Sequence, residues 1–146
     1  MLNIENQTRL EINQKDLETI ANTLTTREID LTICYNPTIQ QYNLEYRGKN
    51  SPTDVLSFPL SSDLMNSGFE HLPLGSIVVS ADYIMDSSKA LGHGLNDELS
   101  LLFIHGLLHL LGYDHEVDSG EMRVKEEALI QKFNLPNSLI VRTEKN

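Results

Sequence analysis

The strongest constraint on the fold of this chain is an apolar, helix-forming run that carries histidines. Residues 105–115 read His-Gly-Leu-Leu-His-Leu-Leu-Gly-Tyr-Asp-His, which gives the spacing H-x-x-x-H-x-x-G-x-x-H. Two histidines four residues apart lie on one face of a helix, one turn from each other. Gly112 can adopt the left-handed conformation that ends a helix, and the chain can then bring His115 back toward the other two. The run therefore predicts a buried helix that presents imidazoles near its C-terminal end.

Three histidines in this arrangement predict a metal site. Three imidazoles leave the fourth position of a tetrahedral zinc ion open, which is typical of a catalytic site rather than a closed structural one. We expect one ion per chain, held by His105, His109 and His115. Zinc is the first expectation, although imidazole ligands also suit nickel and other divalent metals. A structural zinc is the main alternative and would need a fourth protein ligand. The candidates for that ligand are the one thiol and three nearby carboxylates: Cys34, Asp114, Glu116 and Asp118.

The residue after the first histidine argues against a peptidase. Zinc peptidases with this histidine spacing carry glutamate at that position, as the base that activates water. This chain has Gly106 there. Because glycine inside a helix costs about 1 kcal/mol relative to alanine, its presence suggests that packing or access requires it. The sequence thus retains the metal site and lacks the peptidase base.

Length, charge and cysteine content limit the class of protein. The 146 residues suit one domain, which we place at residues 1–142, followed by a loose tail at residues 143–146. The formal net charge of −10 argues against nonspecific binding to nucleic acid, because such binding depends on neutralising phosphates. We find no stretch typical of a signal peptide or a membrane span, and the single cysteine fits a reducing cytosol. We therefore expect a cytoplasmic protein without a membrane partner.

The spacing of apolar residues predicts an α+β fold. Strands are expected over residues 2–6, 29–35, 54–60 and 74–80, and helices over residues 14–25, 37–46, 81–91, 97–111 and up to 133. The expected helix starts are Asn13, Asn36, Ser80, Asn96 and the pair Asp118 and Glu121, and the expected glycine ends are Gly48, Gly92 and Gly112. Residues 61–73 read as a polar loop. Strands alternate with helices early and helices cluster late, which favours a small mixed β-sheet packed against helices, with a central buried helix carrying the histidines.

A second segment of interest is residues 46–59, Tyr-Arg-Gly-Lys-Asn-Ser-Pro-Thr-Asp-Val-Leu-Ser-Phe-Pro. It holds the basic pair Arg47 and Lys49, whereas residues 50–88 contain neither lysine nor arginine. The planar guanidinium of arginine suits bidentate recognition of phosphate. By composition alone, however, Arg47 is more often a solvated surface residue than a site residue.

Together, the two segments resemble the YbeY family of bacterial metal-dependent endoribonucleases. Residues 105–115 match the family pattern H-G-x-L-H-L-x-G-Y-D-H, and residues 46–59 match Y-R-x-K-x-x-P-T-D-V-L-S-F-P. The resemblance covers nearly the whole chain. It implies that His105, His109 and His115 are zinc ligands, and that Arg47 and His105 are catalytic, with Arg47 facing the metal across a cleft. One departure is Ser76, where the family usually has aspartate.

The resemblance also implies a function: a hydrolase that cleaves single-stranded RNA in 16S rRNA 3′-end maturation and in ribosome quality control. The implied partners are the 16S rRNA precursor, the small ribosomal subunit with its proteins, and a ribosome-associated GTPase. A metal-activated water could attack phosphorus, or the ribose 2′-hydroxyl could be deprotonated instead, with Arg47 stabilising phosphate charge. Asp114 and Glu116 are possible hydrogen-bond partners for a ligand histidine.

Two other classes of protein stay open at this point. One is a zinc peptidase, which the three histidines favour and Gly106 opposes. The other is a non-catalytic ribosome-assembly factor whose zinc only holds the fold, which would suit an acidic surface docking on a basic ribosomal protein.

Overall fold

A computed structural model describes residues 2–60 and 72–136. Four strands form one mixed sheet in the order β1-β2-β4-β3. β1 (Leu2–Asn6), β2 (Ile29–Cys34) and β4 (Gly75–Ser80) are mutually parallel, and β3 (Val55–Pro59) pairs antiparallel with β4 at one edge. The predicted mixed sheet is confirmed. The predicted loop at residues 61–73 lies mostly outside the described residues, as does the tail at residues 143–146.

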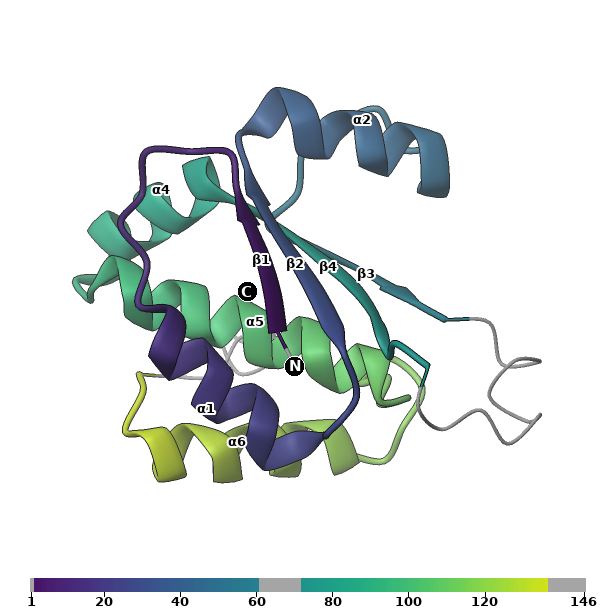
Figure 1. The fold of residues 1–146 in the computed structure, drawn as a ribbon, viewed down its shortest axis with the longest axis vertical. Helices are drawn as coiled ribbons and strands as arrows, with labels where there is room; N and C mark the ends of the chain where they lie inside the picture. The colour runs from purple at the N-terminus through teal and green to yellow at the C-terminus, as the bar shows by residue number, and fades with distance from the viewer. Residues whose placement is uncertain (1, 61–71, 137–146) are drawn as a thin grey trace.

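Helices cover both faces of this sheet (Figure 1). On one face lie α1 (Gln14–Leu24), α5 (Leu95–Leu110) and α6 (Glu121–Phe133), with α4 (Ala81–Leu91) packed against α5. On the other face lies α2 (Asn36–Arg47), over a small cluster made by Cys34, Ile39, Leu56 and Val78. The histidine-bearing helix is therefore central, between the sheet and the outer helices.

Every residue of α5 from Glu98 to Leu108 is buried, which explains why this helix has no polar face. A helix that is apolar all round is buried on all sides. The larger core cluster joins Leu102, Phe103 and Leu107 of α5 to Ile77 of β4 and to Met122 of α6. No helix in the described ranges is long and apolar enough to cross a membrane.

Several predicted helix ends are confirmed. The side chain of Asn13 accepts the backbone N–H of Asp16 at 3.3 Å, and that of Ser80 accepts the N–H of Tyr83 at 3.2 Å. Gly48 and Gly92 end α2 and α4 in the left-handed conformation. These positions were predictable because each depends on a contact within a few residues of sequence.

Two other predicted helix caps are wrong, because the side chain of each predicted cap residue hydrogen-bonds to a residue distant in sequence. Gly94, not Asn96, precedes α5, and Asn96 instead accepts the backbone N–H of Asn13 at 2.8 Å, which joins the starts of α5 and α1. Asn36 is the first residue of α2 rather than its cap, and its Oδ1 accepts the hydroxyl of Ser80 at 2.7 Å.

The start of α6 also differs from the prediction. Gly120 precedes this helix, and Asp118 accepts the backbone N–H groups of Gly120 and Met122. Glu121 accepts the N–H of Ser119 at 2.7 Å. Both acidic side chains therefore organise the turn before α6, although neither is the cap residue itself.

Candidate metal centre

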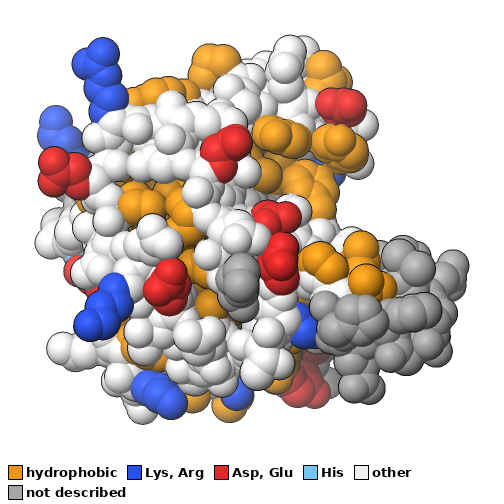
Figure 2. Space-filling view, viewed as in Figure 1, with side chains coloured by type: hydrophobic (Ala, Val, Ile, Leu, Met, Phe, Trp, Pro, Cys, Tyr) orange, Lys and Arg blue, Asp and Glu red, His pale blue; other side chains and the backbone are white. Residues whose placement is uncertain are grey.

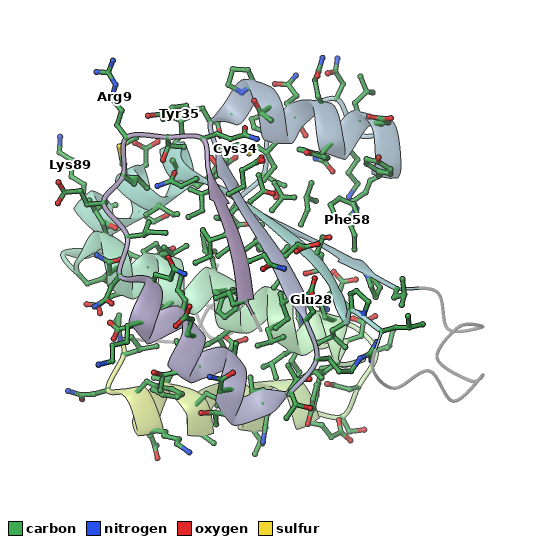
Figure 3. The ribbon with its side chains drawn as sticks, in the orientation of Figure 1. Arg9, Glu28, Cys34, Tyr35, Phe58 and Lys89 are labelled. Atoms are coloured by element: carbon green, nitrogen blue, oxygen red, sulfur yellow. The ribbon has the colours of Figure 1, made fainter. Side chains whose placement is uncertain are left out.

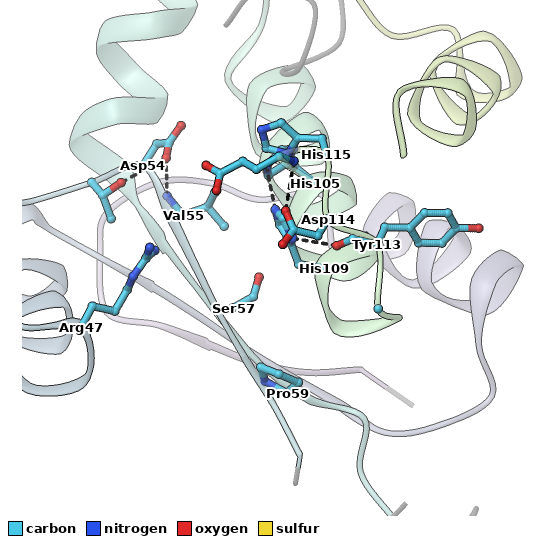
Figure 4. A pocket seen from close by; sticks show the side chains of 13 residues that line it. Arg47, Asp54, Val55, Ser57, Pro59, His105, His109, Tyr113, Asp114 and His115 are labelled. Carbon is cyan, nitrogen blue, oxygen red and sulfur yellow. Dashed lines mark hydrogen bonds between the residues drawn. The ribbon is translucent and has the colours of Figure 1, made fainter. Parts of the chain in front are cut away.

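The structure brings the three predicted histidines together. His105 and His109 lie one turn apart on α5, and His115 returns to them after the helix has ended. One nitrogen of each ring lies within 4.8 Å of the corresponding atoms of the other two. The Nε2 atoms of His105 and His109 are 3.2 Å apart (Figure 4). This is the one such group found among the described residues.

The turn after α5 makes this convergence possible. Gly112 has φ +100°, a conformation that an L side chain rarely adopts. The N–H of Gly112 donates to the carbonyl of His109 at 3.0 Å, and the N–H of Tyr113 donates to that of Leu108 at 3.0 Å. These bonds satisfy the last carbonyls of the helix while the chain reverses. The predicted role of Gly112 as the helix stop is confirmed.

Hydrogen-bond partners at the Nδ1 atoms fix the orientation of two of the three rings. Nδ1 of His105 lies 3.1 Å from Oε2 of Glu126, a fully buried carboxylate on α6. Nδ1 of His109 donates to the backbone carbonyl of Tyr113 at 3.0 Å. Because a carbonyl or carboxylate oxygen accepts, both rings carry the proton on Nδ1 and leave the Nε2 lone pair for a metal. Metal-ligating histidines usually have such a partner on the other ring nitrogen.

The partners proposed from sequence were Asp114 and Glu116, and the structure assigns this contact to neither. Oδ1 of Asp114 instead accepts the backbone N–H of Glu116 at 3.1 Å. Glu126 was missed because it lies 21 residues beyond His105 in sequence. A signal was available: Glu126 stands at helical spacing between the buried Met122 and Leu129, on the apolar face of α6.

The donor set fits a cation. With Nδ1 of His105 and His109 donating elsewhere, two Nε2 lone pairs face each other at 3.2 Å, an arrangement that a positive ion between them would relieve. Burial lowers the pKa of His109, and the nearby His105 lowers it further, so protonation is disfavoured there. Nδ1 of His115 is buried without a hydrogen-bond partner in the described ranges. A buried unpaired nitrogen beside two facing lone pairs is typical of a site for an ion.

The histidines form one side of an open cavity of about 630 Å³. Asp114 lies on the same side, Arg47 and Asp54 lie on the other, on or near α2 and β3, and Ser57 of β3 lies between the two sides (Figure 4). Glu116 also lines the cavity. Arg47 is the last residue of α2 and is exposed. No ion pair joins it to another residue in the part of the chain that is described. Two segments far apart in sequence, 47–59 and 105–116, thus meet at one cavity.

Close packing accounts for Gly106. A Cβ built at this position would lie 3.0 Å from Cγ2 of Ile77, 3.2 Å from Oγ of Ser57 and 3.3 Å from Cγ2 of Val55. The hydroxyl of Ser57 donates to the carbonyl of Gly106 at 3.0 Å. α5 therefore lies directly on β3 and β4, and any side chain at position 106 would have to displace Ile77, Ser57 or Val55. Of the two reasons that the sequence suggested for this glycine, packing is the one observed.

Cys34 and Asp118 do not reach this cavity. Cys34 is fully buried in the cluster beneath α2, its Sγ lies 3.7 Å from the carbonyl of Val79, and burial, with a contribution from Asp82, raises its pKa to about 11. Both carboxylate oxygens of Asp118 accept backbone N–H groups at the start of α6. Neither residue is available to complete a closed metal site.

Ser76, where the resemblance suggests aspartate, also lies away from the cavity. It stands opposite Phe58 in the β3–β4 pair, and its neighbours Gly75 and Ile77 are the β4 residues that approach α5. The serine therefore removes no carboxylate from the wall of the cavity.

Comparison with known proteins identifies relatives along almost the entire chain. The sequence profile described as Endoribonuclease YbeY matches residues 3–134. An endoribonuclease YbeY of Sulfurovum sp. (strain NBC37-1) is 53% identical over 144 residues, covering 99% of this chain and 98% of that protein. One from Aliarcobacter butzleri is 54% identical over 142 residues, covering 97% and 99%. A solution structure of a Thermotoga maritima protein superposes with a TM-score of 0.61 at 25% identity, covering 91% of this chain and 89% of that one.

Proposed function

The chain belongs to the YbeY family of endoribonucleases, and from this we propose that it is a zinc-dependent enzyme that cleaves single-stranded RNA. The proposed substrate is the 3′ end of the 16S rRNA precursor, with a role in ribosome quality control. The observation that carries the proposal is the cavity, which sets a three-histidine cluster opposite an exposed arginine. Residues 1–142 would form the single catalytic domain.

His105, His109 and His115 would hold the metal ion, with the orientation of the first two fixed by Glu126 and by the carbonyl of Tyr113. A bound zinc ion lowers the pKa of water and polarises a phosphoryl oxygen. Three protein ligands leave a position open for substrate or water, as catalysis requires. The zinc could be replaced by nickel or another divalent ion, because imidazole suits several of them.

Arg47 would bind the phosphate from the opposite side of the cavity. Its guanidinium is exposed and without an ion pair to any described residue, so it can meet a phosphate without first breaking a strong contact. A planar guanidinium can donate two parallel hydrogen bonds to a phosphate. Such a donor stabilises the charge that develops as the phosphodiester is attacked.

The proton of the attacking hydroxyl group needs an acceptor, and position 106, where zinc peptidases carry the glutamate base, is glycine. Among the described residues, the carboxylates that line the cavity are those of Asp54, Asp114 and Glu116. Asp54 and Asp114 already accept backbone N–H groups, at 2.8 Å from Val55 and 3.1 Å from Glu116. Each of these contacts leaves further acceptor capacity on the carboxylate.

The test is cleavage of a 16S rRNA 3′-precursor fragment by metal-loaded protein, compared with Arg47→Ala, His105→Ala and the control Lys49→Ala. We expect Arg47→Ala to lower kcat by about 10²–10³-fold while the protein stays folded and metal-bound, since removing one donor to developing charge has this effect in other enzymes. His105→Ala should lose both metal and cleavage. Equal cleavage by all four proteins would indicate a contaminating nuclease and contradict the proposal.

Two further assays with the same proteins, casein digestion and binding to small ribosomal subunits, address the two alternatives. A peptidase would digest casein in a chelator-sensitive way, but the packing around Gly106 opposes it. A non-catalytic assembly factor would bind small ribosomal subunits and cleave nothing. The proposed partners are ribosomal proteins of the small subunit and a ribosome-associated GTPase, and the proposed location is the cytoplasm. The net charge of −10 favours docking on basic ribosomal proteins.

A further inference from the structure

The charge around the cavity poses a problem for an enzyme that acts on RNA. Among the described residues that line it, Arg47 is accompanied by the carboxylates of Asp54, Asp114 and Glu116. The whole chain carries −10, and residues 50–88 supply no lysine or arginine. Proteins that hold RNA through its phosphates need several cations. Contacts that do not depend on charge must therefore supply much of the affinity for a single strand.

A partly exposed aromatic cluster lies immediately beside Arg47. The cluster consists of Tyr42 and Tyr46 on α2 and Phe58 on β3. The ring centroids of Tyr46 and Phe58 are 5.2 Å apart, and the Tyr42 ring stacks on Tyr46 at 6.2 Å with 20° between the planes. Although it touches two rings, Tyr46 is 61% exposed. Its position is fixed from beneath while much of its surface faces solvent.

The aromatic cluster and the cavity are formed by neighbouring residues of the same two segments, at the same edge of the sheet. Tyr46 directly precedes Arg47, and Phe58 stands between Ser57 and Pro59, both of which line the cavity. Phe58 points from β3 toward α2 (Figure 3), so the cluster lies on the opposite face of the sheet from the histidines. β3, whose residues contribute to both sites, is the edge strand of the sheet. Hydrophobic side chains gather around α2 and the adjoining edge of the molecule (Figure 2).

We propose that Tyr46, supported by Tyr42 and Phe58, is a stacking platform for one base of a single-stranded RNA whose backbone passes over the edge at β3 into the cavity. This inference rests on the proposed endoribonuclease function. Bases stack on exposed aromatic rings with little regard to sequence, because every base has a flat π face. Tyr46 is one residue from Arg47, the arginine assigned to the phosphate. The residue paired across the sheet with Phe58 is the uncharged Ser76, so no carboxylate at that pair repels the strand.

If the cluster had only a structural role, a different exposure and side-chain shape would be expected at Tyr46 than if Tyr46 stacks on a base. A ring that only covered Phe58 would be buried by the contact, and an aliphatic side chain could replace it. A stacking platform needs a flat ring with an open surface, held in a fixed orientation to reduce the entropy lost on binding. The exposure of Tyr46 and its two ring contacts match the second requirement.

The experiment is a double-mutant cycle, in which one change removes the protein side chain and the other removes the RNA base. A short labelled single-stranded RNA is prepared with one abasic nucleotide, moved stepwise along the strand, and binding to the metal-loaded protein is measured by fluorescence anisotropy alongside cleavage kinetics. With the wild-type protein, one abasic position should weaken binding on the order of 10-fold, the size typical of losing one base–aromatic stack. With Tyr46→Ala, the intact RNA should bind about as weakly, and the abasic position should cause no further loss.

Two matched variants separate stacking from packing. Tyr46→Phe should keep wild-type affinity, whereas Tyr46→Leu, which still covers Phe58, should lose it. The losses in Tyr46→Ala and Tyr46→Leu should appear in KM with kcat retained. Leu44→Ala, a 48% exposed apolar side chain on the same helix, is the control that should change nothing. The stacking proposal would be contradicted by any of three results: additive losses of affinity in the cycle, wild-type affinity in Tyr46→Leu, or an equal loss of affinity in Leu44→Ala. If the wild-type protein neither binds nor cleaves the intact RNA, the proposed function itself fails. Cleavage that is unchanged in Tyr46→Ala overturns this inference alone.

Discussion

The two sides of the cavity are built in opposite ways. On the side of α5 and α6, His105 and Glu126 are buried, and the ring nitrogens of His105 and His109 have hydrogen-bond partners that fix their orientation. On the side of α2 and β3, Arg47 and Tyr46 are exposed, and Arg47 has no ion pair within the described chain. The first side suits a small ion that needs fixed ligands, and the second suits a flexible strand arriving from solvent. The difference predicts that substitutions on the two sides change different measured quantities.

The largest effect should come from His109→Ala, which removes one of the three proposed metal ligands on the side of α5 and α6. Two remaining imidazoles bind a metal ion far more weakly than three, so we expect no retained metal after gel filtration and no RNA cleavage. Metal content by atomic emission measures this directly. His93→Gln is the matched control, because His93 lies outside the cluster and contacts Glu98 at 2.8 Å, a hydrogen bond that glutamine can replace. Full metal content in His109→Ala would contradict the assignment of the metal site to the histidine side of the cavity.

A smaller effect is expected from Glu126→Gln. The change removes the negative charge that orients His105 without reducing the size of the side chain. Loss of such a partner typically lowers metal affinity 10- to 100-fold. Competition with a chelator of known affinity would measure the zinc Kd. Glu127→Gln is the control, because Glu127 is on the same helix, is only partly buried and pairs with Arg123 at the surface. Equal affinities in the two variants would mean that burial of Glu126 serves the fold and not the metal.

Gly106→Ala tests how closely α5 packs on β3 and β4. Helix propensity alone predicts that alanine would stabilise α5 by about 1 kcal/mol. The contacts of 3.0–3.3 Å to Ile77, Ser57 and Val55 predict the opposite, a loss of about 1–2 kcal/mol, typical of an overpacked core. Urea denaturation gives the free energy of unfolding, and its sign decides between the two. A stabilised variant would show that α5 has room to move.

The smallest effect concerns pH and the metal-free protein. Burial and the neighbouring His105 hold the pKa of His109 below its ordinary value of about 6.5 in the folded state. As the pH falls through about 6.5, the unfolded chain takes up a proton at this residue that the folded chain does not, so the free energy of unfolding decreases. Thermal melts of metal-free protein from neutral to mildly acidic pH should show this decrease, and it should be weaker in His109→Ala. An identical pH dependence in that variant would assign the effect to other groups.

What could be predicted from the sequence is what local spacing determines. The strands near Leu2, Ile29, Val55 and Gly75 followed from runs of apolar and β-branched residues, and the convergence of three histidines followed from a helix, a glycine and a turn. None of these depends on contacts between distant residues.

What could not be predicted depends on tertiary contacts. Asn96 was expected to cap its own helix and instead binds the backbone of Asn13, 83 residues earlier. Glu126 holds a histidine from another helix, and Tyr46 meets Phe58 only because α2 packs on β3. Periodicity identifies Glu126 as inward-facing, but a single sequence does not state which neighbour it meets.

The contribution of α6 to the metal centre has a consequence for the timing of synthesis. The three histidines emerge from the ribosome before Glu126, which completes the contact with His105 only when α6 has been made and has packed against α5. A nascent chain that ends before this helix therefore has the motif but not its fixed geometry. We therefore expect tight metal binding at the three histidines, and with it the proposed RNA cleavage, only after α6 has been made and has packed against α5.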